Sequence, residues 1–398
     1  MRVLVHLNSL ELGGTQLNAV DFAVAARAHG VESILVGAQD TLASSPNLLD
    51  YAAPAGVEVE VYEPAVGMRG HAAQLAALAE RLRVDLIHVY GMWGAARAVF
   101  WGPARFGRIP WVQTVYEMSV TPVVLRHMPL MVGTGYLLDE QADRPGGTVL
   151  ISPPVDLDRD SPAAAGLTDL RQEARLGAGP LIGIVSRLDS NMKAFSIGVA
   201  IDAMAGLGET GATLFIVGGG DAAEELQARA RRVNDILGRD GVRLLGPMSD
   251  PRPAYAAADI MLGMGGSAAR SLAFGKPLIV QGEAGWSQTF DPASADTLAR
   301  SSYWSPDRVA DPVGDLEAAI RVLLADPACR AELGTFGRQF ASSRFGLPAM
   351  TERLCTFYRA ALQSYGPAEW LADVPREGRR LVEKIARVAA RPRQEEAA

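Results

Sequence analysis

Cysteines are few in this chain, and its sequence lacks a long apolar run. Only two cysteines, Cys329 and Cys355, occur among 398 residues, so neither a disulfide framework nor a cysteine-based metal site is expected. No apolar run approaches the roughly 18 residues that a membrane-spanning helix requires. The chain begins with a strand-like segment, residues 2–7, and not with a signal sequence. These absences predict a cytoplasmic protein without an integral membrane segment.

The charge balance is acidic, with a formal net charge of -7. A nucleic-acid-binding protein would carry a basic face, so no nucleic-acid partner is expected. A small basic pocket for a phosphorylated metabolite is compatible with this balance. Hydrophobic residues make up 48% of the chain and charged residues 21%, which is typical of a globular protein long enough for two domains.

Strand-like and helix-like segments alternate in two rounds. The first round has apolar strands at residues 2–7, 33–37, 57–62, 86–90, 111–115 and 148–152. The second has them at residues 181–185, 214–217, 242–245, 259–262 and 278–280. Helical spacing between the strands predicts the α/β class, with two Rossmann-like, doubly wound parallel sheets.

A proline- and aspartate-rich stretch, residues 153–166, separates the two rounds and is typical of a linker. We therefore expect an N-terminal domain at residues 1–160 and a C-terminal domain at residues 166–366. The amphipathic tail at residues 367–398 is expected to pack back on the first domain. Acidic residues interleaved in the tail disfavour the alternative, a contact with a membrane surface.

A glycine-rich turn lies between two apolar runs in residues 259–286. Gly265 and Gly266 follow the first run, and Ser267 is expected to be the N-cap of a helix over residues 268–274. Backbone amides at such a helix N-terminus bind anions without a basic side chain. A turn that merely packs is the alternative interpretation.

An arginine and a lysine share the loop that follows residues 181–185. Arg187 offers a bidentate fork to phosphate oxygens and Lys193 a point charge, although both could simply be solvated. Residues 218–223 nearly match the dinucleotide-binding fingerprint. Nicotinamide chemistry is nevertheless disfavoured, because the acidic residue expected at the end of the next strand is missing.

Aromatic and acidic side chains end two strands of the first domain. Tyr90 and Trp93 follow one strand, and Tyr116 and Glu117 follow another, where they could contact a sugar. The alternative is that the aromatic side chains belong to the core and that Glu117 is solvated. His88 lies within a strand and is expected to be buried and hydrogen-bonded. The other histidines show neither metal-ligand nor catalytic-triad spacing.

Seven segments, in order, resemble the retaining family-4 group of GT-B glycosyltransferases, which use nucleotide-diphosphate sugars. The segments are residues 12–16 (LGGTQ), 88–93 (HVYGMW), 151–156 (ISPPVD), Arg187 with Lys193, 217–221 (VGGGD), 242–246 (VRLLG) and 270–277 (RSLAFGKP). The resemblance implies the GT-B architecture, in which two Rossmann-like domains face an interdomain cleft.

Taken together with the chemistry of the side chains, the resemblance gives candidate roles for individual residues. Arg187 and Lys193 would neutralise the donor pyrophosphate and stabilise the departing diphosphate. Further donor or phosphate contacts would come from Gly13, Gly14, Gly265, Gly266, Ser267 and Arg270. The nucleotide would be bound by Gly218, Leu245, Met248 and Glu283. The sugar or acceptor would be bound by Thr15, Tyr90, Trp93, Tyr116 and Glu117, of which Tyr116 and Glu117 are also catalytic candidates. No metal and no cofactor are expected beyond the nucleotide sugar, with UDP or GDP favoured as its nucleotide.

Three positions depart from the family's pattern. Its glutamate pair falls on Leu262 and Arg270, and an arginine cannot accept a hydrogen bond from a ribose hydroxyl. Ribose recognition could pass to Glu283. The family's histidines at the first-domain strand ends are Tyr90 and Tyr116 here, and Glu117 stands where a glycine is usual.

The sequence therefore predicts a glycosyltransferase that moves a sugar, with retention of anomeric configuration, to a small-molecule acceptor. A lipid-linked acceptor is the alternative for the second substrate. Two other functions stay open: a sugar-nucleotide epimerase of GT-B fold, and a non-catalytic protein that binds a nucleotide sugar and assists a partner.

Overall fold

The computed structural model describes residues 1–42, 46–92 and 94–389. The chain divides into two compact units, Met1–Ser152 with Thr351–Ala398, and Pro153–Met350. The borders lie at 152 and 350 where the sequence suggested 160 and 366. Residues 153–160 join the second unit because Val155 is hydrogen-bonded to Phe345 and Leu347. Helix α14 (Leu347–Ser364) continues into the first unit, where the Tyr358 hydroxyl lies 2.7 Å from Nδ1 of His88.

The first unit contains a seven-stranded sheet among the described residues, in the order β3-β2-β1-β4-β5-β6-β7. Its strands are β1 (Arg2–His6), β2 (Glu32–Ala38), β3 (Val59–Tyr62), β4 (Leu86–Tyr90), β5 (Trp111–Val115), β6 (Leu130–Val132) and β7 (Thr148–Leu150). Every neighbouring pair is parallel. The sequence did not predict β6, because three residues are too few to show a strand's two-residue period.

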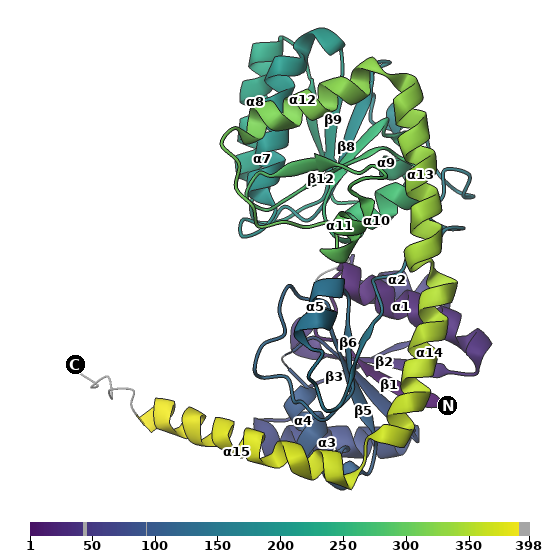
Figure 1. Ribbon diagram of the computed structural model, residues 1–398, viewed down its shortest axis with the longest axis vertical. Coiled ribbons are helices and arrows are strands. Elements are labelled where there is room, and N and C mark those ends of the chain that lie inside the picture. Colours follow the sequence, from purple (N-terminus) through teal and green to yellow (C-terminus); the bar gives the residue numbers. More distant parts are fainter. Residues whose placement is uncertain (43–45, 93, 390–398) are drawn as a thin grey trace. The chain divides into compact units, whose positions relative to one another are not determined.

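Helices surround this sheet (Figure 1), and α3 (Gly67–Leu82), α4 (Ala96–Trp101) and α5 (Gly135–Glu140) bury apolar side chains in one core with its strands. The other helices of this unit in the described ranges are α1 (Gly14–Ala26), α2 (Leu48–Ala52), α14 and α15 (Pro367–Ala389), with 3-10 turns η1 (Arg27–His29), η2 (Gln39–Thr41), η3 (Ala53–Ala55) and η4 (Arg105–Gly107). The start of α15 packs on this unit. Trp370 stacks on Phe100 with ring centroids 5.2 Å apart and donates a 2.9 Å hydrogen bond to its carbonyl oxygen.

The second unit contains a six-stranded sheet among the described residues, in the order β10-β9-β8-β11-β12-β13. Its strands are β8 (Leu181–Val185), β9 (Thr213–Val217), β10 (Val242–Gly246), β11 (Ile260–Gly263), β12 (Leu278–Gln281) and β13 (Ser287–Thr289). All pairs are parallel except β12–β13. The antiparallel β13, which the sequence did not predict, follows a reversal at Gly285, where φ is 97°.

Helices α7, α8 and α12 bury their apolar stripes against one face of the second sheet, and α10 packs on α13 (Figure 1). The helices of this unit are α6 (Leu170–Glu173), α7 (Ala194–Ala203), α8 (Ala223–Leu237), α9 (Arg252–Ala257), α10 (Gly266–Ala273), α11 (Ala295–Arg300), α12 (Pro312–Ala325) and α13 (Pro327–Phe345), with the 3-10 helix η5 (Met204–Thr210). None of the helices in the described ranges is both long enough and apolar enough to cross a membrane.

Candidate functional site

The strand order of the second unit reverses between β8 and β11. Chain connections run from β8 outward to β9 and β10, and from β11 in the opposite direction to β12. Open α/β sheets bind ligands at such a switch point, outside the carboxyl ends of the strands. The loops that leave β8 and β11 contain Arg187 with Lys193, and Gly265 with Gly266, so the residues predicted for phosphate binding flank one switch point.

The loop after β8 is fixed by the loop after β9. Leu188 donates its amide to Gly219 (2.9 Å) and accepts from Ala222 (2.9 Å), while the Ser190 hydroxyl donates to the Asp221 carboxylate (2.6 Å). The hydrogen bonds to Ser190 lower the pKa of Asp221. These hydrogen bonds between the two loops hold the segment between Arg187 and Lys193 in one conformation.

Gly218 is a glycine for reasons of packing. A Cβ atom there would lie 1.8 Å from the carbonyl oxygen of Ser186, and φ is 146°. Its amide donates to the Gly246 carbonyl (2.9 Å). Backbone atoms of Ser186 and Gly246 therefore occupy the space beside Gly218 and accept its amide. The nucleotide contact expected of Gly218 stays a prediction.

Lys193 is the half-buried cation of the site, whereas Arg187 is exposed. Burial is the main reason that the pKa of Lys193 is lowered to about 8, and the positive charge of Arg187 lowers it further. The negative charges of Asp189 and Glu283 act in the opposite direction. Asp189 helps to form the start of α7, because its Oδ1 accepts the Met192 amide at 2.9 Å. A bound anion would relieve the desolvated ammonium group of Lys193, so this residue is primed for a negatively charged ligand.

Helix α10 presents free backbone amides beside this loop. Its N-cap is Gly265, at φ 59° and ψ −131°, and no described side chain caps it. The predicted N-cap role of Ser267 is wrong: the helix begins two residues earlier than predicted, at Gly266, and the Ser267 hydroxyl donates to the Met264 carbonyl (3.1 Å). Among the described residues, no neighbouring atom lies within 4 Å of a Cβ built on Gly265 or Gly266, so a ligand has room to approach the amides.

Arg270 lies on the same helix but is engaged elsewhere. Its Nε lies 3.4 Å from Oδ2 of Asp160, and 17% of its side chain is exposed. Leu262, at the other glutamate position of the family's pattern, is fully buried in the core. The phosphate contact predicted for Arg270 therefore competes with an existing ion pair.

The residues predicted to bind the nucleotide lie on two further loops of this unit. Leu245 and Met248, at the end of β10 and just after it, are partly exposed. Glu283 follows β12, and its amide donates to the Ser305 carbonyl (3.1 Å). The negative charge of Glu283 acts to raise the pKa of Lys193, against the lowering by burial.

The first unit has its own switch point, between β1 and β4. The loop after β1 ends at Gly13, the N-cap of α1, and no described side chain caps this helix. Gln16 donates to Asn8 (2.9 Å), and a Cβ on Gly13 would lie 2.5 Å from Oε1 of Gln16. Gly14 and Thr15 lie in the first turn, beside the free amides. Asn8 and Gln16 were not predicted as site residues, because the sequence offers no sign that they pair.

Tyr90, Tyr116 and Glu117 lie together at the ends of β4 and β5. Tyr90 is 1% exposed, and its ring centroid lies 6.3 Å from that of Tyr116 in an edge-on arrangement. The Tyr116 hydroxyl donates to the Ile151 carbonyl (3.1 Å). Tyr90 therefore belongs to the core, as the alternative interpretation held, and Tyr116 is tied to the backbone. Trp93 lies outside the described residues.

Glu117 retains an unsatisfied group. Its Oε2 is buried and has no hydrogen-bond partner among the described atoms, and burial raises the pKa of the carboxyl. A substrate hydroxyl could supply the missing partner. His88, by contrast, is fully buried with Tyr358 and Thr114, and burial lowers its pKa to about 3. It is a structural, neutral histidine, as expected.

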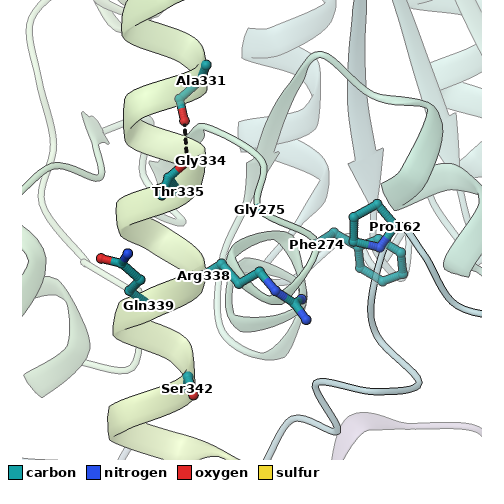
Figure 2. Close-up of a pocket in the computed structure, with 9 residues that line it drawn as sticks. All are labelled: Pro162, Phe274, Gly275, Ala331, Gly334, Thr335, Arg338, Gln339 and Ser342. Carbon is teal, nitrogen blue, oxygen red and sulfur yellow. Dashed lines mark hydrogen bonds between the residues drawn. The ribbon is translucent and has the colours of Figure 1, made fainter.

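Within the described ranges, no cluster of three or more histidine, cysteine, aspartate or glutamate residues could hold a metal ion. A shallow concavity of ≈510 Å³ lies between α13 and the C-terminal end of α10, which is the end away from Gly265 (Figure 2). In Figure 2, Arg338 extends from α13 toward the end of α10, and it donates to the Leu157 carbonyl (2.9 Å) and to that of Ala273. The concavity is therefore not part of the switch-point site.

The second unit is similar to a known family. Residues 179–326 match the family described as Glycosyl transferases group 1. The matched range contains the Arg187–Lys193 loop, α10 and Glu283.

Part of the chain is similar to a mycobacterial enzyme. The chain is 28% identical over 224 residues to a GDP-mannose-dependent alpha-(1-6)-phosphatidylinositol monomannoside mannosyltransferase of Mycobacterium tuberculosis, in two strains. The similarity covers 52% of this chain and 55% of the relative, so the chain spans about half the length of the curated relatives it matches.

Solved structures share the fold over most of the chain. HepE of Anabaena, solved in complex with UDP, has a TM-score of 0.68 at 17% identity, covering 90% of this chain and 100% of that one. A glycosyltransferase from Rickettsia africae has a TM-score of 0.71 at 14% identity, covering 91% and 98%. The chain therefore has the GT-B fold, and its second unit resembles the Glycosyl transferases group 1 family.

Proposed function

We propose that the protein transfers a glycosyl group from a nucleoside-diphosphate sugar to an acceptor, with retention of anomeric configuration. One observation carries this proposal. Two cationic side chains and an uncapped helix N-terminus flank the same switch point, on the loops after β8 and β11. That arrangement fits a diphosphate, because amides and cations neutralise its oxygens from two sides.

The chemistry asks the protein to stabilise the departing diphosphate. As the bond between the anomeric carbon and the phosphate oxygen breaks, negative charge grows on the leaving group. The acceptor oxygen forms the new bond to carbon and passes its proton to the departing phosphate. Lys193, whose pKa is lowered by burial, gains most from a nearby anion, and Arg187 adds a second charge. Such prearranged charges lower the barrier without moving during the reaction.

Other residues are proposed to hold the neutral parts of the substrates. Glu283 accepts hydrogen bonds from the hydroxyls of the nucleotide's ribose, because Arg270 stands where the family has its ribose-binding glutamate. The unsatisfied Oε2 of Glu117 accepts a hydroxyl of the sugar or acceptor. UDP and GDP are the nucleotides to test first, because HepE was solved with UDP and the mycobacterial relative is GDP-mannose-dependent.

The acceptor is proposed to be a small molecule, in line with the acidic net charge of the chain. A lipid-linked acceptor is the alternative, because the name of the mycobacterial relative specifies a phosphatidylinositol monomannoside. Assays that offer free sugars and detergent-solubilised phosphatidylinositol glycosides as separate acceptors distinguish the two.

Transfer assays with labelled UDP-glucose and GDP-mannose test the proposal. Arg187→Ala and Lys193→Ala are each expected to abolish transfer, while circular dichroism and a cooperative thermal transition show that each variant is folded. A retained rate in either folded variant would remove the pyrophosphate assignment. An altered free nucleotide sugar with no conjugated acceptor would instead identify an epimerase, and binding without turnover a non-catalytic protein.

A further inference from the structure

Arg270 forms a shielded ion pair that the sequence does not suggest. Its partner Asp160 is 1% exposed and lies in the segment that follows Pro153. Arg159 approaches the other carboxylate oxygen, Oδ1, at 3.7 Å. Removing one member of such a pair leaves an uncompensated buried charge, so each residue requires the other.

A second arginine joins the same two pieces of chain. Arg338, on α13, donates through Nη2 to the Leu157 carbonyl (2.9 Å) and through Nη1 to the Ala273 carbonyl at the end of α10. Its Nη1 also lies 3.5 Å from the Asp160 carbonyl. The segment from Leu157 to Asp160 is thus attached to α10 by two guanidinium groups.

Helix α10 depends on such attachments. It has only eight residues, and no side chain in the described part of the chain caps it, so internal hydrogen bonds alone do not fix its direction. Its free amides point from the end near Gly266, whereas Arg270 and Ala273 attach the other half of the helix. An anchor at the second half therefore sets the direction in which the amides point.

We propose that Arg270 is a positioning residue: through Asp160 it fixes α10 so that the amides of Gly266, Ser267 and Ala268 meet the donor's phosphates. This inference rests on the proposed function, because it assumes that those amides bind a diphosphate. It also replaces the predicted phosphate contact of Arg270 with an indirect role. A glutamate at this position, as in the family's pattern, would face the Asp160 carboxylate and break the anchor.

A double-mutant cycle on nucleotide binding tests the inference. Dissociation constants for UDP, GDP, UMP and GMP are measured by calorimetry for wild type, R270Q, D160N and R270Q/D160N. Each single variant is expected to weaken the preferred diphosphate by about tenfold, and the double variant no further, because both break the same anchor. The monophosphates should lose less affinity, since they offer fewer oxygens to α10.

Two further variants separate positioning from general damage. R171Q breaks the Arg171–Asp259 pair (3.2 Å) at the amino end of β11, away from the carboxyl ends where the site lies, and should leave diphosphate affinity within about twofold of wild type. R270E should bind worse than R270Q, and adding D160N to R270E should restore part of the loss. These comparisons use variants whose thermal unfolding shows a folded protein.

The outcomes are distinguishable. Additive losses, an unchanged affinity in folded R270Q, an equal loss for mono- and diphosphates, or an R270E variant that binds as tightly as wild type would each overturn the positioning role. A wild-type protein that binds neither UDP nor GDP would instead refute the proposed function, before any variant is compared.

Discussion

Raising the pH from 7 to 9 should weaken donor binding, because it discharges Lys193. Burial lowers the pKa of this residue to about 8. With that pKa the charged fraction falls from roughly 0.9 at pH 7 to roughly 0.1 at pH 9, so a site that requires the ammonium loses about tenfold in affinity. Affinity falls as pH rises because the anion binds the protonated form of Lys193, and the free protein loses that proton.

The assay is a calorimetric titration with the preferred nucleoside diphosphate at half-unit steps of pH. Lys193→Arg is the matched control, since a guanidinium stays charged throughout this range. Its affinity should vary little between pH 7 and 9, and any slope left belongs to the nucleotide or to other groups. Lys193→Met should bind weakly at every pH.

A wild-type slope equal to that of Lys193→Arg would refute the reasoning, because Lys193 would then not sense the anion. Protein stability should respond in the opposite direction. Between about pH 8 and 10.5 the unfolded chain keeps a proton on Lys193 that the folded chain has lost, so this residue makes stability rise with pH there. Thermal unfolding of wild type against Lys193→Met isolates that contribution.

Three other predictions address single positions. Gly218→Ala should lower the free energy of unfolding by about 2–4 kcal/mol, because its Cβ would lie 1.8 Å from the Ser186 carbonyl oxygen. Gly14→Ala, where a Cβ has open space, should change the free energy of unfolding by less than about 1 kcal/mol. Chemical denaturation measures both values, and equal effects would contradict the clash expected at Gly218. Arg187→Lys should keep part of the diphosphate affinity that Arg187→Ala loses, because charge survives without the bidentate fork; calorimetry showing the two equal would mean that the fork alone matters. Glu117→Gln should leave nucleotide affinity unchanged and slow transfer. Weaker nucleotide binding in this variant would mean that Glu117 contacts the nucleotide and not the sugar or acceptor.

The parts of the site that follow local chemistry were predictable. Strand ends, glycine turns and basic residues on the loops after β8 and β11 can be read along the chain, and the sheet order brings those loops to one switch point. The match over residues 179–326 covers the same loops. The individual contacts of Arg187 and Lys193 with a donor stay predictions.

Features that depend on distant partners were not predictable. Asp160 and Arg270 are far apart in the sequence, and neither residue alone suggests an ion pair. Ser267 matched the N-cap preference, but a positive φ at Gly265 starts the helix earlier. The sequence placed residues 351–366 in the C-terminal domain, whereas contacts such as the hydrogen bond between Tyr358 and His88 join them to the first unit.

Hydrogen–deuterium exchange with and without nucleotide tests the central claim most directly, because it reports on the backbone amides themselves. Saturating UDP or GDP should slow exchange in a peptide spanning residues 263–270 and in one spanning residues 186–194. The start of α15, which packs on the first unit through Trp370, should not respond. Nucleotide binding shown by calorimetry, with exchange at residues 263–270 unchanged, would contradict the account.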